Sequence, residues 1–179
     1  MASFTNGTSI CTLKGEIPVE ELVVGDRVIT RDNGLQTIKR ITRRDLDYGQ
    51  LAAAQHLQPI LVMAGALGNA LPERDTLVSP NLRILQSTGL DATDSLAAAK
   101  NLVDNRLVRN CSVLGVRYVH IEFMRHEVVL ANGIWAESFH AEDRSLGAKG
   151  NAQRTELFDI HPDMKSARPV VAAKANAAR

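Results

Sequence analysis

The chain alternates apolar and polar residues over many short stretches, which is the period of a β-strand with one buried face. The hairpin signal Asp32-Asn33-Gly34 separates two such stretches, because Asn-Gly supplies the positive φ values that a type I′ turn requires. In chain order, the strands predicted in the first half are residues 9–13, 27–30, 36–42, 60–64, 76–79 and 83–86.

The second half is predicted to be rich in strands as well. Asn132-Gly133 marks a tight turn between strands at 128–130 and 134–138. Before it, one strand presents two sets of side chains to opposite faces, because successive residues of a strand alternate. The first set is Val119, Ile121 and Phe123, and the second is Tyr118, His120 and Glu122.

Helical patterns are scarce. The best helix candidate is Ser95–Val103, which is rich in alanine and has Asp94 as its N-cap. Pro18–Leu22 predicts a single helical turn, with proline near its first position. Residues 46–56 and 65–74 are predicted to be loops. Strands on both sides of one short central helix predict an all-β domain.

Composition narrows the classes of partner. The length of 179 residues suits one domain, and a hydrophobic fraction of 45% can fill its core. A net charge of +1 argues against a nucleic-acid partner. A basic cluster is the local exception, and we interpret it as the guard of an exposed strand edge, with a binding patch as the alternative. The cluster comprises Lys39, Arg40, Arg43 and Arg44.

The sequence shows neither a signal peptide nor an apolar run of the roughly 20 residues that span a bilayer, so no membrane association is expected. Cys11 and Cys111 match no zinc pattern, and free thiols are expected in preference to a disulfide. No cofactor or metal is predicted. The compartment and the oligomeric state stay open.

The composition changes after Glu142. Residues 143–179 are polar, rich in alanine and mixed in charge, with two prolines. We therefore predict a folded domain over 1–142 and a partly ordered C-terminal extension over 143–179, in which Phe158 and Ile160 dock on the body.

Several blocks of the sequence resemble Hint domains, the module shared by hedgehog proteins and inteins. The opening Ser3-Phe4-Thr5-Asn6-Gly7-Thr8 carries the resemblance, together with Gly25-Asp26-Arg27-Val28. Residues 65–80, 125–133 and 137–139 look like the later blocks of a bacterial Hint subfamily, in the same order. The resemblance covers residues 3–140 and implies a horseshoe of mostly antiparallel strands with its nucleophile near the centre.

The resemblance also implies a reaction. Hint domains begin with a Cys or Ser that attacks the preceding carbonyl and converts an amide into a thioester or an ester. Carried over, Ser3 attacks the carbonyl of Ala2 in an N–O acyl shift, and the upstream segment of the same chain is the substrate. Such a step needs a nucleophile, a proton donor for the departing amine and stabilisation of the oxyanion.

The assisting residues match the family only in part. The family has Thr or Ser, two residues and then His beside the scissile bond; here Ser79 takes the hydroxyl position and Leu82 stands where the histidine is expected. General acid–base help is worth about 10²- to 10⁴-fold, so cleavage is expected to be slow or absent. His126 and His120 occupy late positions that the family often uses for catalysis, and structural hydrogen bonding is the alternative for each.

The end of the last block departs from inteins, which finish with His-Asn. Here Glu137-Ser138 takes that place, and serine cannot cyclise as asparagine does, so full splicing is not expected. Only Met1 and Ala2 precede Ser3, so cleavage would release a dipeptide. Either the sequence belongs to a longer protein or the chain is a remnant.

Two hypotheses remain. In the first, the domain processes its own chain once through Ser3, helped by Ser79 and by His126 or His120. In the second, a Hint scaffold that has lost its chemistry serves as a binding or structural module. A hydrolase acting on other proteins ranks third, because the sequence has no nucleophile elbow.

Overall fold

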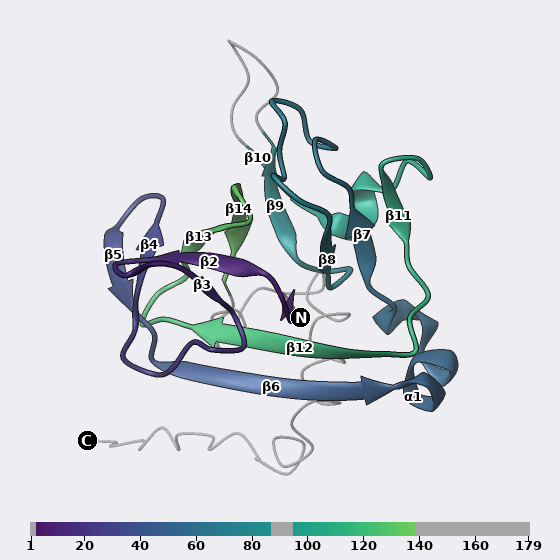
Figure 1. The fold of residues 1–179 in the computed structure, drawn as a ribbon, viewed down its shortest axis with the longest axis horizontal. Helices are drawn as coiled ribbons and strands as arrows, with labels where there is room; N and C mark the ends of the chain where they lie inside the picture. Colours follow the sequence, from purple (N-terminus) through teal and green to yellow (C-terminus); the bar gives the residue numbers. More distant parts are fainter. Residues whose placement is uncertain (1–2, 87–94, 139–179) are drawn as a thin grey trace, which may run out of the picture.

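Two antiparallel sheets form the body of the protein in the computed structural model, which describes residues 3–86 and 95–138 (Figure 1). The six-stranded sheet has the order β11-β7-β8-β1-β12-β6, and the eight-stranded sheet has the order β10-β9-β14-β13-β2-β4-β5, with β3 paired to β2. The all-β fold of mostly antiparallel strands is therefore confirmed.

The strands have these bounds. In the first sheet they are β11 (Val108–Asn110), β7 (Ile60–Val62), β8 (Thr76–Val78), β1 (Phe4–Thr5), β12 (Gly115–Glu122) and β6 (Arg40–Asp47). In the second they are β10 (Ser95–Ala98), β9 (Arg83–Gln86), β14 (Ile134–Glu137), β13 (Val128–Ala131), β2 (Ser9–Thr12), β4 (Arg27–Thr30), β5 (Gly34–Thr37) and β3 (Gly15–Pro18).

The long strands β12 and β6 pair over their whole length and run along the base of the molecule (Figure 1). Above them, β2 to β5 stand on one side, and β7, β8 and β11 stand on the other. The main core contains the apolar face of β12, Val119 and Ile121, together with Phe4 and Val78 from the neighbouring strands. Burial of these side chains supplies the main driving force for folding.

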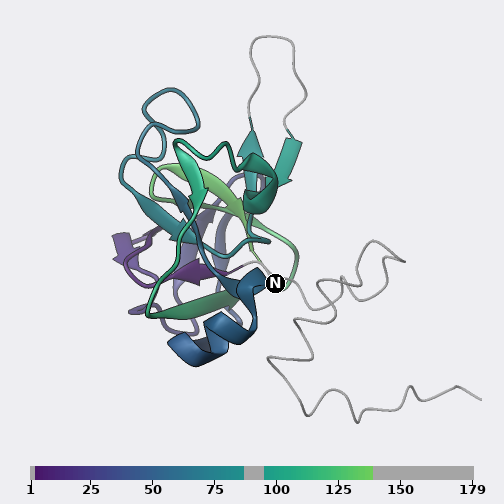
Figure 2. The same ribbon diagram turned by 90° about the vertical axis from the view of Figure 1, so that its right-hand side faces the viewer.

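The single α-helix of the described residues, α1 (Tyr48–Ala53), lies where a loop was predicted, at one end of β6 and β12 (Figures 1 and 2). Asp47 starts it with a capping box: its side chain accepts a hydrogen bond from the Gln50 amide at 2.8 Å, and the Gln50 side chain accepts one from the Asp47 amide at 3.0 Å. Leu51 buries the inner face of α1 against Leu46 and Tyr118 in a second, smaller core.

The predicted helix over 95–103 is wrong. Residues 95–98 form β10, which pairs with β9, and a short 3₁₀ helix, η2 (Ala99–Leu102), follows; a second one, η1 (Gln55–Leu57), follows α1. Alanine propensity amounts to tenths of a kilocalorie per residue and yields to the strand pairing that β9 offers. The predicted N-cap, Asp94, lies outside the described residues.

The turns agree better with the sequence. Asn132 and Gly133 both adopt positive φ, 48° and 81°, as a type I′ turn requires. The hairpin of β4 and β5 exists, but its turn is not type I′: among its residues only Gly34 has positive φ, at 62°. A three-residue loop followed by a left-handed glycine is the usual alternative. Pro18 ends β3, and the helical turn predicted there is reduced to one hydrogen bond from the Glu21 amide to the Pro18 carbonyl.

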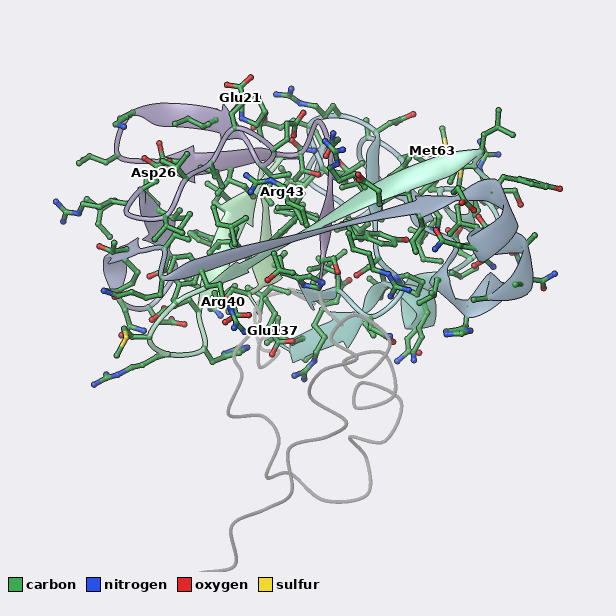
Figure 3. All side chains as sticks on the ribbon, turned by 90° about the horizontal axis from the view of Figure 1, so that it is seen from below. Glu21, Asp26, Arg40, Arg43, Met63 and Glu137 are labelled. Carbon is green, nitrogen blue, oxygen red and sulfur yellow. The ribbon has the colours of Figure 1, made fainter. Side chains whose placement is uncertain are left out.

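The basic cluster lies along β6, the edge strand of its sheet, as predicted. Arg40 pairs with Glu122, and Arg43 donates to the backbone carbonyls of Glu20 and Leu22. Figure 3 shows Arg43 on the side of β6 that faces the Glu21 segment and Arg40 on the other side. Two of its four cations are therefore engaged within the molecule.

Other predictions concern single features. Cys11 and Cys111 are free thiols. Within the described ranges, no helix has the length and apolar character to cross a membrane. The domain boundary at 142, the extension over 143–179, and its residues Phe158 and Ile160 fall outside the described part of the chain, as do Met1 and Ala2.

Candidate active site

Three of the predicted site residues lie in one row across adjacent strands. Phe4 of β1 pairs with Val78 of β8 on one side and with Val119 of β12 on the other. One position away in the same register, Ser3 therefore lies between Ser79 and His120. Residues far apart in the sequence come together because β1, the first strand, is inserted between β8 and β12.

Two hydrogen bonds join Ser3 and Ser79. The Ser3 amide donates to Oγ of Ser79 at 2.9 Å, and the Ser79 amide donates to the Ser3 carbonyl at 3.2 Å. The Ser3 amide nitrogen is the nitrogen of the Ala2–Ser3 peptide bond. A hydroxyl group thus lies at the atom that becomes the leaving amine if this bond is broken.

The hydroxyl of Ser3 faces the imidazole of His120. Its Oγ lies 3.0 Å from Nε2 and 3.3 Å from Nδ1. Ser3 is only 3% exposed and His120 only 1%. A buried hydroxyl within hydrogen-bonding distance of an imidazole nitrogen has the geometry that activation of a serine by a histidine requires.

The turn after β8 positions Ser79 and directs Leu82 into the main core. Pro80 follows Ser79, and the Leu82 amide donates back to the Ser79 carbonyl at 3.0 Å. The side chain of Leu82 is fully buried in the main core. The place that the family resemblance gives to a histidine is therefore a packing position in this chain.

His126 belongs to a charged cluster between β9, β13 and β14. Its Nε2 lies 2.5 Å from Oε1 of Glu137, and the same carboxylate oxygen accepts from Arg83 at 3.0 Å. Glu137 is buried, whereas His126 and Arg83 are partly exposed. Beyond Glu137, Ser138 closes the strand: its amide donates to the Glu127 carbonyl, and its hydroxyl accepts from the Glu127 amide.

Asn132 links two segments next to the candidate site. The sequence pattern predicted its turn but not the contacts of its side chain. Its side-chain oxygen accepts from the Ser9 amide at 2.9 Å, and its side-chain nitrogen donates to the Thr76 hydroxyl at 2.8 Å. Its carbonyl accepts from the Glu73 amide at 3.1 Å. One buried side chain thus ties β2 to the start of β8, the strand that leads to Ser79.

The polar face of β12 contains two further buried groups, Tyr118 and Glu122, which the sequence placed on the same face as His120. Burial raises the pKa of Tyr118 far above its ordinary value, so the phenol stays neutral and donates to the Leu57 carbonyl at 2.7 Å. Glu122 forms a two-point pair with Arg40. Within residues 3–86 and 95–138, no cluster of three or more His, Cys, Asp or Glu side chains could hold a metal ion.

The comparisons identify the class to which this fold and site belong. The family model described as the Hint domain matches residues 2–143. Because this match covers most of the chain, the protein belongs to the Hint domain family.

Among similar solved structures, an intein agrees with this assignment at the level of the fold. A DnaB intein from Synechocystis sp. PCC 6803 is 10% identical, with a TM-score of 0.51 over 78% of this chain and 100% of its own. A bacterial intein-like domain from Clostridium thermocellum is 14% identical, with a TM-score of 0.49 over 78% of this chain and 99% of its own. No curated protein matches the sequence.

Proposed function

We propose that this Hint domain rearranges its own backbone once, by an N–O acyl shift at the Ala2–Ser3 bond. The observation that carries the proposal is the contact between Oγ of Ser3 and Nε2 of His120 at 3.0 Å. The substrate is the segment that precedes Ser3 in the same chain. Membership of the Hint family supports self-processing as the class of activity.

In the proposed reaction, an imidazole nitrogen of His120 takes the proton of the Ser3 hydroxyl as Oγ attacks the Ala2 carbonyl carbon. The carbon–nitrogen bond then breaks, and the Ser3 nitrogen leaves as an amine. The hydroxyl of Ser79, 2.9 Å from that nitrogen, is placed to deliver the proton that the amine needs. Ser79 recovers its proton from the imidazolium of His120, so the net change is the transfer of one proton from Oγ to nitrogen, and the shift from amide to ester is balanced.

The ester must then be cleaved by an outside nucleophile or by water. Serine is a weaker nucleophile than a thiolate, and the expected histidine at position 82 is leucine. His120 offers one base, and a second imidazole in the family position would add help of about 10²- to 10⁴-fold. We therefore expect a slow, single-turnover reaction.

The second candidate is a Hint scaffold without chemistry, acting as a binding or structural module. The complete burial of Leu82 favours it, because the chain uses a catalytic position of the family for core packing.

The deciding experiment fuses a stable, folded protein ahead of Met1 and follows the release of its acyl group with hydroxylamine by mass spectrometry. Release from the parent fusion that disappears in Ser3→Ala supports the acyl shift. Ser9→Ala is the matched control, since Ser9 is a buried serine on β2. A folded fusion that stays intact for days under these conditions rules the reaction out and leaves the scaffold role.

A further inference from the structure

The pair Arg40–Glu122 lies on the same face of the sheet as the Ser3–His120 contact, two residues along β12 from His120. Arg40 Nε is 3.0 Å from Oε2 of Glu122, and Nη2 is 2.9 Å from Oε1. Residues i and i+2 of a strand point the same way and are separated by about 6.6 Å. The pair has no part in the proposed reaction, and neither residue belongs to the main hydrophobic core.

The two charges of the pair are not equally exposed. The Glu122 side chain is 11% exposed, whereas the Arg40 side chain is 52% exposed. Solvent screens an exposed charge far more strongly than a buried one. At His120 the negative charge of Glu122 therefore acts with less screening than the positive charge of Arg40.

We infer that Glu122 is a positioning residue that strengthens His120 as a base by favouring its protonated form, and that Arg40 holds this carboxylate in place and moderates its effect. The inference rests on the proposed function, because it concerns the imidazole that takes the Ser3 proton. An anion near an imidazole stabilises the imidazolium that forms when the proton arrives.

On the β12–β6 pair, Glu122 is the acidic side chain of the face that carries His120. On β6, Thr42 lies directly opposite His120, and Arg44 lies opposite Tyr118 on the same face. Ser3 and Ser79 are uncharged, and Tyr118 stays neutral because burial raises its pKa. Arg44 acts in the same sense as Arg40 and opposes Glu122.

The test is the titration of His120, followed by NMR of the imidazole in the whole chain without a fusion partner. Glu122→Gln keeps the size of the side chain and removes its charge, and we expect the midpoint to move to lower pH by roughly half a unit or more. Arg40→Gln leaves the carboxylate unpaired, and we expect the midpoint to move to higher pH. A purely structural role does not give shifts of opposite sign.

The chain offers a matched control in the same two strands. Arg117 and Asp45 form another two-point pair between β12 and β6, with distances of 2.5 and 2.7 Å. Their register places them on the opposite face from His120, and they are exposed. Asp45→Asn should therefore leave the His120 midpoint where it is.

The outcomes separate the inference from the proposed function. Opposite shifts in Glu122→Gln and Arg40→Gln, with none in Asp45→Asn, support the inference, even if the fusion protein never cleaves. No shift, or a shift of the same sign in both variants while their NMR spectra show a folded protein, overturns it. Removing the buried partner of a half-exposed pair can destabilise the fold, so Glu122→Asp, which keeps the charge, serves as a second variant and should retain the parent midpoint more closely than Glu122→Gln.

Discussion

Ser3 and Ser79 form a closed pair in which each backbone amide donates to the other residue, one to a hydroxyl at 2.9 Å and one to a carbonyl at 3.2 Å. Only the first of these bonds depends on a side chain. The two bonds therefore allow a separation of roles. The backbone bond aligns β1 with β8, and the Ser79 hydroxyl accepts a hydrogen bond from the nitrogen of the Ala2–Ser3 bond.

Ser79→Ala tests that separation. Loss of the hydroxyl leaves a buried amide without its acceptor, and we expect the free energy of unfolding to fall by about 1–3 kcal/mol. We also expect slower acyl release from the fusion, because the departing amine loses its proton donor. Ser79→Thr should restore much of both quantities. Urea unfolding and mass spectrometry measure them, and an unchanged release rate in Ser79→Ala would contradict the assigned role.

His120 and His126 are distinguished by their partners. His120→Gln removes the proposed base beside Ser3, and we expect acyl release to fall by about 10²- to 10⁴-fold. His126→Gln disturbs the cluster with Glu137 and Arg83, and its rate should stay within about threefold of the parent rate, since the proposed base is left in place. A reversal of this order in quenched time courses would move the base to His126.

Leu82→His restores the residue type that the family resemblance expects. Because Leu82 is fully buried in the core, an imidazole there loses apolar contacts and lacks a built partner, so the free energy of unfolding should fall by about 2–4 kcal/mol. Leu82→Met, which keeps the volume and apolar character, should cost less than about 1.5 kcal/mol. Equal stability of the two variants in urea would show that position 82 is not a packing position. Faster acyl release in a folded Leu82→His variant would show that the scaffold still positions the scissile bond.

Asn132 combines a left-handed backbone with four hydrogen bonds to other segments, two of them through its side chain. Asn132→Gly keeps the backbone freedom and removes only the side-chain bonds, with an expected loss of about 2–3 kcal/mol. Asn132→Ala should lose more, because alanine also resists a φ of 48°. Thermal and urea unfolding measure the order. A smaller loss for alanine than for glycine would count against backbone strain at this turn.

Asp26 gives the fold a dependence on acid. The Val23 amide, donating to its carboxylate, and the nearby Lys14 lower the pKa of Asp26 below 3.8. A depressed pKa in the folded state means that the stabilisation is complete above the unfolded value and is lost as the pH falls through the folded value. Asp26→Asn should therefore unfold at a lower temperature than the parent at pH 7, and the difference should vanish towards pH 2. A difference that stays constant over this range would exclude the charge as its source.

Many of the strands and the turn at Asn132-Gly133 follow from the sequence because period-2 patterns and Asn-Gly pairs act locally. The strands near Ser9, Arg27, Thr76, Arg83 and Val128 lie where the pattern predicts them. The helix predicted over residues 95–98 is wrong because these residues pair with β9, and a local sequence pattern does not show that pairing. Helix α1 could have been found from Asp47 and Gln50, whose spacing is that of a capping box.

The candidate site residues come from the sequence, but their arrangement comes from the structure. The family resemblance suggested Ser3, Ser79, His120 and His126 without saying which histidine faces the nucleophile. That depends on the register of β1 between β8 and β12, which no local pattern encodes. Period-2 alternation did place Glu122 on the face of His120, and only the structure pairs it with Arg40.

The insertion of β1 between β8 and β12 also determines when the candidate site can form during protein synthesis. Ser3 leaves the ribosome before Ser79, and His120 emerges after both. A nascent chain therefore lacks the contact between Ser3 and His120 until β12 has been translated and paired with β1. Any backbone chemistry that depends on this contact can begin only after that pairing.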